Sequence, residues 1–392
     1  MAAPDKYKIL GGFHKYYKGV ENAPCMTLFV GGNHEASGYN RELHLGGWVA
    51  KNIYFMGYSN VLKYKGLKIG GISGIYMQHN YNNNYNETPA MFGKNSMHHV
   101  RKFEVEKLKQ YRGDLDIFVS HDWPTLITDK RNGEKELATL LKIKPYFKQD
   151  IKKGELGSPV SNDILERLRP AWWFSSHLHV RHRVNVNWSG SSVEKNKDEI
   201  NVSDSENENA DKPYQMPQRK KTRFLALDKC LPGRKYLEII DFELDEHTDV
   251  VDTLQYDTEW LAILKTLQKH IPSGDQILGK DLDPEAEKFW NNIGSDVMRE
   301  IATEKDKLEQ NSVSLMVPDN FSMIAPAVDG DFNENSRIPR GYAQRPYRES
   351  NMVGRPNTDS HLLGGGASKF YHNPQTELFC SKFDIPDIFK DY

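Results

Sequence analysis

Three short apolar runs in this chain each end directly at side chains that bind metal ions in proteins. Runs of this length and composition are typical of buried β-strands. The runs and the side chains that follow them are Met26–Val30 with Asn33 and His34, Asp116–Ser120 with His121, and Trp172–Ser176 with His177 and His179. Where such strands end at one edge of a sheet, the residues that follow them lie close together. The pattern therefore predicts a convergent site at that edge and favours an α/β fold.

The side chains at these strand ends have metal-binding chemistry. Imidazole nitrogens suit zinc, manganese and iron, and an amide oxygen suits harder ions. Gly31 and Gly32 precede Asn33 and let the backbone approach a ligand closely. His177 and His179 are two residues apart, so an extended strand would point both toward one metal or two adjacent ones. A single histidine at a strand end is more often a surface residue, but three such ends in this order favour a metal site.

Further periodic segments surround these strands. Strand-like runs are predicted at 53–56, 61–64, 68–76, 222–228 and 236–242, and 180–186 is expected to continue the third strand. Helices are predicted at 13–18, 100–111, 137–145, 160–168, 257–270, 284–293 and 294–310. Gly70 and Gly71 indicate either close backbone packing or a β-bulge. The remaining histidines, His98 and His99 among them, receive structural or solvent-exposed roles by default.

Long polar segments divide the 392-residue chain, in which apolar residues make up 38%. We expect an N-terminal domain over 1–188, a disordered insertion over 189–221 and a further region over 222–310. A largely disordered tail is expected over 311–392. Near its end, residues 373–380 are apolar enough to dock back on the protein or to bind a partner.

Composition narrows the compartment and the class of partner. The net charge of −2 gives no global signature of nucleic-acid binding, although a local basic patch remains compatible with it. Three cysteines, far apart and odd in number, favour a reducing compartment over a disulfide scaffold. No run approaches the roughly 18 apolar residues of a membrane helix, and the first residues lack the apolar core of a secretory signal. We therefore expect a soluble intracellular protein.

Several longer motifs connect the chain to a known family. They are Gly31–Ser37, Gly46–Ala50, Asn52–Tyr54, Lys68–Ile75, His99–Arg101, Ser120–Pro124, Leu156–Pro159, Trp173–Val180, Phe224–Pro232 and Asn373–Thr376. On these motifs the chain resembles the RNA lariat debranching enzymes of the calcineurin-like metallophosphoesterase superfamily. The resemblance implies a β-sandwich flanked by helices, with a mostly helical C-terminal region. It also implies hydrolysis of the 2′-5′ phosphodiester at the branch point of excised intron lariats, in mRNA splicing in the nucleus.

The resemblance also assigns residue roles. Asn33, His121 and His177 resemble the ligands of one metal position, His179 a ligand of a second position, and His34 the catalytic histidine. The family site holds two divalent ions, of iron, zinc or manganese, which polarise the phosphodiester and activate water.

The polar and aromatic segment 77–98 lacks periodicity, and loops of this length are usually functional or disordered. Within the resemblance, residues 73–101 correspond to the lariat recognition loop. Tyr76, Tyr81 and Tyr85 are expected to stack on unpaired bases, and Lys94 and Arg101 to meet phosphates. The alternative for each of these residues is a place in a solvated loop.

One part of the family pattern is not found in this sequence. The family begins with a strand carrying Cys-x-His or Asp-x-His, followed by a strand ending in Gly-Asp, and neither motif is present. We expect from this an N-terminally truncated domain with an open sheet edge, incomplete metal positions, marginal folding and poor activity. The alternatives are an inactive RNA-binding protein of intron turnover and another metallophosphoesterase, such as a phosphatase.

Overall fold

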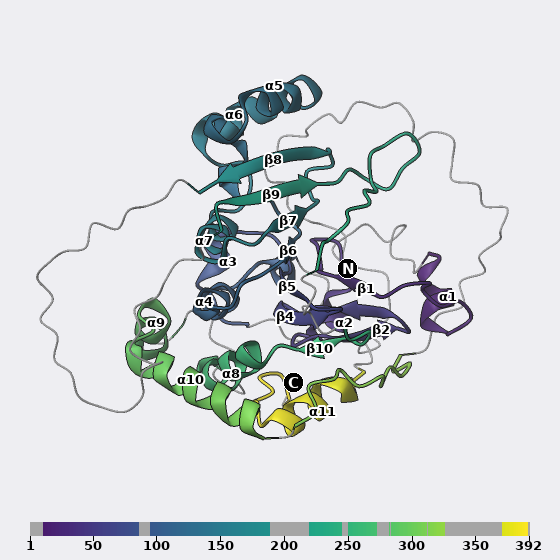
Figure 1. Cartoon of the computed structure of the whole chain (residues 1–392), viewed down its shortest axis with the longest axis vertical. Helices are drawn as coiled ribbons and strands as arrows, with labels where there is room; N and C mark the ends of the chain where they lie inside the picture. The colour runs from purple at the N-terminus through teal and green to yellow at the C-terminus, as the bar shows by residue number, and fades with distance from the viewer. Residues whose placement is uncertain are drawn as a thin grey trace, which may run out of the picture.

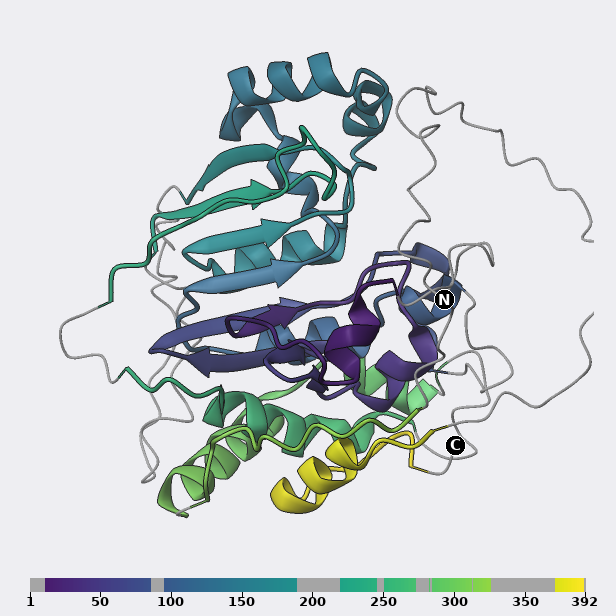
Figure 2. The same ribbon diagram turned by 90° about the vertical axis from the view of Figure 1, so that its right-hand side faces the viewer.

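The computed structural model describes residues 11–85, 95–188, 219–244, 250–272, 282, 284–311, 313–325 and 371–390. Figures 1 and 2 show these residues as coloured ribbons from two perpendicular directions. Most residues of the two segments expected to be disordered, 189–221 and 311–392, fall outside the described residues, and Lys94 does too. In the part of the chain that is described, every helix is too short or too polar to cross a membrane.

Within the described residues, seven strands form the larger sheet, in the order β10-β4-β5-β6-β7-β9-β8. Their bounds are β4 (Ser59–Tyr64), β5 (Leu67–Ile72), β6 (Ile117–Ser120), β7 (Trp172–Ser175), β8 (His182–Asn187), β9 (Lys221–Ala226) and β10 (Gln255–Tyr256). The strands β5, β6, β7 and β9 run parallel, and the outer strands pair antiparallel. The residues that follow β6 and β7 therefore emerge at one edge of the sheet, as the sequence predicts.

Three other strands of the described residues form a smaller sheet, in the order β1-β3-β2. They are β1 (Thr27–Phe29), β2 (Gly47–Ala50) and β3 (Ile53–Phe55). The two sheets approach closely at Gly71, where an added Cβ atom would lie 3.0 Å from the side chains of Met56 and Val30. Because β4 and β5 pair across Gly70 and Gly71 without a register shift, close packing explains these glycines and the bulge alternative is wrong.

The described helices are α1 (Phe13–Tyr17), α2 (Ser37–Glu42), α3 (Gln78–Tyr81), α4 (Lys102–Gln110), α5 (Glu134–Ile143), α6 (Phe147–Lys153), α7 (Pro159–Leu168), α8 (Thr258–Leu267), α9 (Pro284–Asn291), α10 (Ser295–Gln310) and α11 (Pro374–Phe383), with 3₁₀ turns at Asn95–His98, Thr125–Thr128, Lys130–Asn132 and Gln268–His270. Figure 1 shows α4 and α7 on the face of the larger sheet opposite the smaller sheet. The helix α7 begins where the sequence supplies a cap, because Ser158 Oγ accepts the Ser161 N–H at 3.1 Å.

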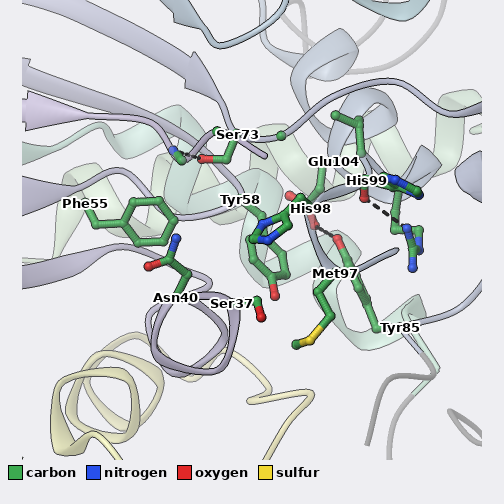
Figure 3. A pocket seen from close by; sticks show the side chains of 15 residues that line it. Ser37, Asn40, Phe55, Tyr58, Ser73, Tyr85, Met97, His98, His99 and Glu104 are labelled. Carbon is green, nitrogen blue, oxygen red and sulfur yellow. Dashed lines mark hydrogen bonds between the residues drawn. The ribbon is translucent and has the colours of Figure 1, made fainter. Parts of the chain in front are cut away.

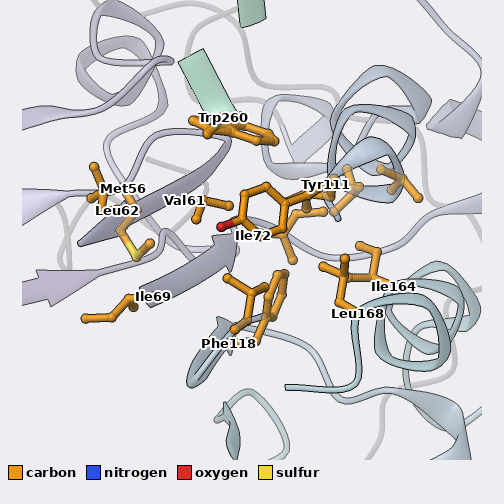
Figure 4. Packing of buried hydrophobic residues seen from close by; sticks show 14 of the residues in the cluster. Met56, Val61, Leu62, Ile69, Ile72, Tyr111, Phe118, Ile164, Leu168 and Trp260 are labelled. Carbon is orange, nitrogen blue, oxygen red and sulfur yellow. The ribbon is translucent and has the colours of Figure 1, made fainter. Parts of the chain in front are cut away.

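The main core lies between the larger sheet and these helices. Figure 4 shows Ile72 of β5 and Phe118 of β6 among side chains of α7 and α8. Phe118, Ile164 of α7 and Trp260 of α8 are each at most 1% exposed. Burying a large apolar side chain stabilises the fold by about 1.5–3 kcal/mol, so this contact joins the C-terminal helices firmly to the sheet.

Two predicted strands differ from the structure. The run 180–186 does not continue the third strand, because β7 ends at Ser175 and β8 is a separate strand with β9 between the two. Residues 236–242 form no strand within the described part of the chain. Leu237 and Ile239 are 73% and 87% exposed, so the alternating pattern is present without a described neighbour to pair with. A strand needs such a neighbour for its backbone hydrogen bonds, and sequence alternation alone does not supply one.

The C-terminal motif docks back on the smaller sheet, which was one of its two predicted roles. The Gln375 side chain accepts the Trp48 N–H at 2.8 Å and donates to the Trp48 carbonyl at 2.9 Å. The Asn373 N–H donates to a Glu42 carboxylate oxygen at 2.9 Å. Gln375 thereby satisfies backbone groups of the outer strand β2 as a neighbouring strand would.

Candidate metal centre and adjoining pocket

Backbone hydrogen bonds bring the three strand-end loops together. The Gly31 N–H donates to Ser73 Oγ at 2.9 Å, and the Gly74 N–H donates to the Gly31 carbonyl at 2.8 Å. These bonds tie the loop after β1 to the end of β5. The Ser176 N–H donates to the His121 carbonyl at 3.1 Å, which ties the loops after β6 and β7. The strand-end edge is therefore fixed by its backbone, and its side chains are left to face one another.

Asn33, His121 and His177 meet at this edge. His121 Nε2 lies 3.1 Å from Asn33 Oδ1 and 3.0 Å from His177 Nδ1. Two donors bound to one ion at about 2.1 Å and about 90° apart are about 3.0 Å from each other. One amide oxygen and two imidazole nitrogens at these separations are compatible with the single divalent metal ion that the resemblance implies for this trio.

Burial prepares His121 for this role. Burial, reinforced by the neighbouring His177 and His179, lowers the pKa of His121 to about 3. The imidazole is therefore neutral near pH 7. Only the neutral ring offers a nitrogen lone pair to a metal, so no proton has to leave before an ion binds.

A buried network of serine and tryptophan holds the ends of β6 and β7. Trp173 Nε1 donates to Ser120 Oγ at 2.9 Å and to Ser175 Oγ at 3.1 Å. Ser120 Oγ donates in turn to the Asp122 carbonyl at 2.6 Å. Trp123 Nε1 donates to the Ser176 carbonyl at 2.8 Å. The sequence analysis assigned no role to these residues, although a serine follows the apolar residues of both strands and precedes the histidines.

The predicted geometry of His177 and His179 is wrong. Both have a φ of 52°, in the left-handed region, and both lie in the loop between β7 and β8. An extended-strand argument does not apply to such a loop. His177 joins the metal trio, whereas His179 is exposed and its carbonyl accepts a hydrogen bond from Arg234 at 3.2 Å. Burial and the positive charge of Lys229 lower the pKa of His179 to about 4.

The second metal position is not assembled from the residues that the structure describes. Among them, no three His, Cys, Asp or Glu side chains gather closely enough to hold an ion. The third donor beside His121 and His177 is the amide of Asn33.

Gly32, in the loop after β1, leaves room for the His121 imidazole. A Cβ atom on Gly32 would lie 2.6 Å from His121 Cε1, closer than real Cβ contacts allow. His34 follows two residues later and is exposed. The His34 charge is among those that influence the pKa values of His121 and His98, so its imidazole belongs to the same part of the site.

Gly31 and Gly32 also line a pocket, which Figure 3 shows from close by. Its other walls come from the start of α2, from β3 and from residues 97–104. His98 belongs to this wall and is 7% exposed, and its Nε2 has no hydrogen-bond partner within the described residues. The sequence predicts only a default structural or solvent-exposed role for His98, because the residue type alone does not show that its ring is buried in a pocket.

Two of the expected RNA contacts are buried in this region. Arg101 is 1% exposed and donates to the carbonyls of Asn84, Ser96 and His99 at 3.3, 3.3 and 2.9 Å. Tyr85 is 6% exposed and donates to Glu104 Oε1 at 2.7 Å. In this conformation neither side chain is open to a phosphate or a base.

Tyr76 and Tyr81 are half-buried, with ring centroids 5.7 Å apart. They are the two expected RNA-contacting tyrosines that keep an accessible face in the described region.

The chain is similar to a family of known proteins. Residues 219–388 match the family model described as the lariat debranching enzyme, C-terminal domain. The chain is 36% identical to lariat debranching enzyme A of Xenopus laevis, over 99% of its own length and 61% of that protein. It is 38% identical to the lariat debranching enzyme of Drosophila pseudoobscura pseudoobscura, over 99% of its own length and 68% of that protein. The Arabidopsis thaliana enzyme is 41% identical, over 69% of this chain and 57% of the plant protein.

The chain thus spans about 60% of the length of the vertebrate relatives that it matches. The similarity extends along nearly all of this chain, across both sheets and the C-terminal helices. It confirms the resemblance that the sequence motifs indicate. The chain belongs to the lariat debranching enzyme family.

Proposed function

We propose that this protein is a metal-dependent phosphodiesterase that hydrolyses the 2′-5′ bond at the branch point of excised intron lariat RNA. The relatives named above are lariat debranching enzymes, which supports the reaction class. The observation that carries the proposal is the meeting of Asn33, His121 and His177 at one strand-end edge.

The metal would be held by these three side chains. Imidazole and amide donors suit Fe²⁺, Zn²⁺ and Mn²⁺, and His179 would contribute to a second ion. A divalent ion bound there supplies positive charge that polarises a phosphodiester and lowers the pKa of water. The protein keeps His121 neutral, holds the loops rigidly and leaves space at Gly32 for the imidazole.

His34 is the candidate acid. Its exposed imidazole belongs to the same part of the site as the trio, so it is accessible to a bound phosphodiester and to the oxygen that leaves it. In our proposal His34 gives a proton to the departing 2′ oxygen of the branch nucleotide. Proton transfer of this kind contributes about 10²–10⁴-fold to a rate.

Substrate recognition would fall to the segment 73–101 beside the centre. Tyr76 and Tyr81 have faces on which unpaired bases can stack, the usual route to single-stranded RNA. Tyr85 and Arg101, which were also expected to contact RNA, instead hold the pocket wall through internal hydrogen bonds. Lys94 remains a candidate phosphate contact and lies outside the described residues. Because introns are excised in the nucleus, we place the activity in mRNA splicing and intron turnover in that compartment.

Three substrates test the proposal: a branched RNA with one 2′-5′ linkage, the matching linear RNA, and p-nitrophenyl phosphate as a generic phosphatase substrate. We expect metal-dependent cleavage of the branched RNA alone, at the 2′-5′ bond. Elemental analysis of the purified protein should show a bound divalent transition metal. Preferential hydrolysis of p-nitrophenyl phosphate would identify a phosphatase instead. Branched-RNA binding without metal and without cleavage would identify a non-catalytic RNA-binding protein.

A further inference from the structure

The pocket lined by Gly31 and Gly32 contains an imidazole with unused hydrogen-bonding capacity. His98 is more than nine-tenths buried, yet its Nε2 has no partner among the described residues. Figure 3 shows its ring among the side chains that line the pocket. An unpaired buried polar atom destabilises the folded protein, so a ligand that paired with it would recover free energy.

The position of His98 is held by its backbone. The Ile75 N–H donates to the His98 carbonyl at 2.9 Å. Gly74, with a φ of 94°, allows this contact, since a Cβ atom there would lie 2.3 Å from that carbonyl oxygen. Arg101 fixes the next carbonyl along, that of His99. The imidazole is therefore held ready for a ligand and needs little rearrangement to bind one.

The chemistry of the pocket selects a small neutral polar group. Burial lowers the pKa of His98 to about 4, so the ring is neutral near pH 7. The side-chain amide of Asn40 also lines the pocket. The Glu104 carboxylate is balanced by Lys107 at 2.9 Å, and the Arg101 guanidinium is occupied by backbone carbonyls. These two charged side chains of the wall are therefore already paired within the protein, which disfavours their binding a phosphate.

The volume of the pocket also favours a small polar group. The cavity has a volume of about 30 Å³. About 10–15 Å³ on this measure holds one water molecule, so the space suits a hydroxyl group and excludes a nucleobase. A hydroxyl both donates and accepts, and it therefore pairs with either tautomer of the imidazole.

We propose that His98 binds a ribose 2′-hydroxyl of a nucleotide joined to the branch nucleotide. This inference rests on the proposed function, because it takes branched RNA as the ligand. Gly32 lines the pocket and also abuts His121, so a ribose whose 2′-hydroxyl enters the pocket lies next to Asn33, His121 and His177. The 2′-hydroxyl is the group that distinguishes RNA from DNA, and His98 would make this site selective for ribose.

A binding experiment tests this without relying on turnover. The reference ligand is a branched RNA with a non-hydrolysable 2′-5′ linkage. Three further versions each carry one 2′-deoxy substitution, at a different one of the three nucleotides attached to the branch nucleotide. The linear RNA is the fifth ligand. The proteins are the wild type, His98→Phe, His98→Gln and the remote control His270→Phe. Melting temperatures verify that each variant is folded.

We expect one deoxy substitution to weaken wild-type binding by about threefold to tenfold, the value of one hydrogen bond. His98→Phe should bind that ligand and the all-ribose ligand equally, His98→Gln should retain part of the discrimination, and His270→Phe should behave as the wild type. Equal binding of all branched ligands by the wild type would overturn the inference, and so would undiminished discrimination by His98→Phe. A wild type that does not prefer branched over linear RNA would overturn the proposed function itself.

Discussion

The strand-end loops and the segment 75–104 meet at Gly31 and Gly32, but the two regions use their polar side chains differently. At the strand ends, backbone bonds hold the loops, and Asn33, His121 and His177 are left facing one another. In the segment 75–104, Arg101 donates hydrogen bonds to backbone carbonyls and Tyr85 donates one to Glu104, so both side chains are engaged within the protein. Side chains that are not needed to hold the loops can bind a metal ion. Side chains whose hydrogen bonds hold a loop together cannot also bind a ligand.

The largest expected effect tests the metal side of this comparison. His34→Ala should lower the single-turnover cleavage rate of branched RNA by about 10²–10⁴-fold, because it removes the proposed proton donor. His34 is exposed, so the melting temperature and the metal content should stay at wild-type values. A variant that cleaves at the wild-type rate would show that the proton comes from another group.

The next effect tests the loop side. Arg101→Ala should lower the free energy of unfolding by about 3 kcal/mol, because three carbonyls lose a buried charged donor. Urea denaturation measures this, with exposed Lys153→Ala as a control within about 0.5 kcal/mol of the wild type. If Arg101 served as a phosphate contact instead, stability would be unchanged. The salt dependence of RNA binding would then fall by about 0.7 in logarithmic slope.

A smaller effect separates two tyrosines of the same segment. Tyr85→Phe should cost about 1–2 kcal/mol of stability, because Glu104 loses a buried hydrogen-bond partner. Half-buried Tyr81→Phe should cost less than about 0.5 kcal/mol, and both rings keep their aromatic faces. The same denaturation experiment compares the two. Equal costs would mean that the Tyr85 hydroxyl does not hold this wall of the pocket.

The sequence was most informative where topology places residues. The parallel strands β6 and β7 end at one edge, so their apolar runs and order place His121 beside His177. Asn33 instead follows β1 of the smaller sheet, and its loop reaches this edge through the hydrogen bonds of Gly31 with Ser73 and Gly74. For Gly70 and Gly71 the sequence left close backbone packing and a β-bulge open, and the unbroken pairing of β4 with β5 decides for packing.

The sequence was less informative where a side chain's role depends on its neighbours. Nothing local indicates that His177 and His179 adopt a left-handed backbone, or that residues 236–242 lack a described strand to pair with. Arg101 has the residue type of a phosphate contact, and only the fold brings carbonyls of Asn84 and Ser96 around it. His98 stands in no motif, and its unpaired nitrogen is visible only once the pocket is assembled.

Metal binding by the strand-end trio is the most direct test. Chelator-treated protein is titrated with Zn²⁺ or Mn²⁺ by calorimetry, for the wild type, His121→Ala and the matched buried-histidine control His182→Ala. We predict that His121→Ala weakens the affinity by more than about 100-fold, because it removes the central donor, while His182→Ala binds as the wild type does. Wild-type affinity in His121→Ala would contradict the account, since Asn33 and His177 would then not share an ion with it.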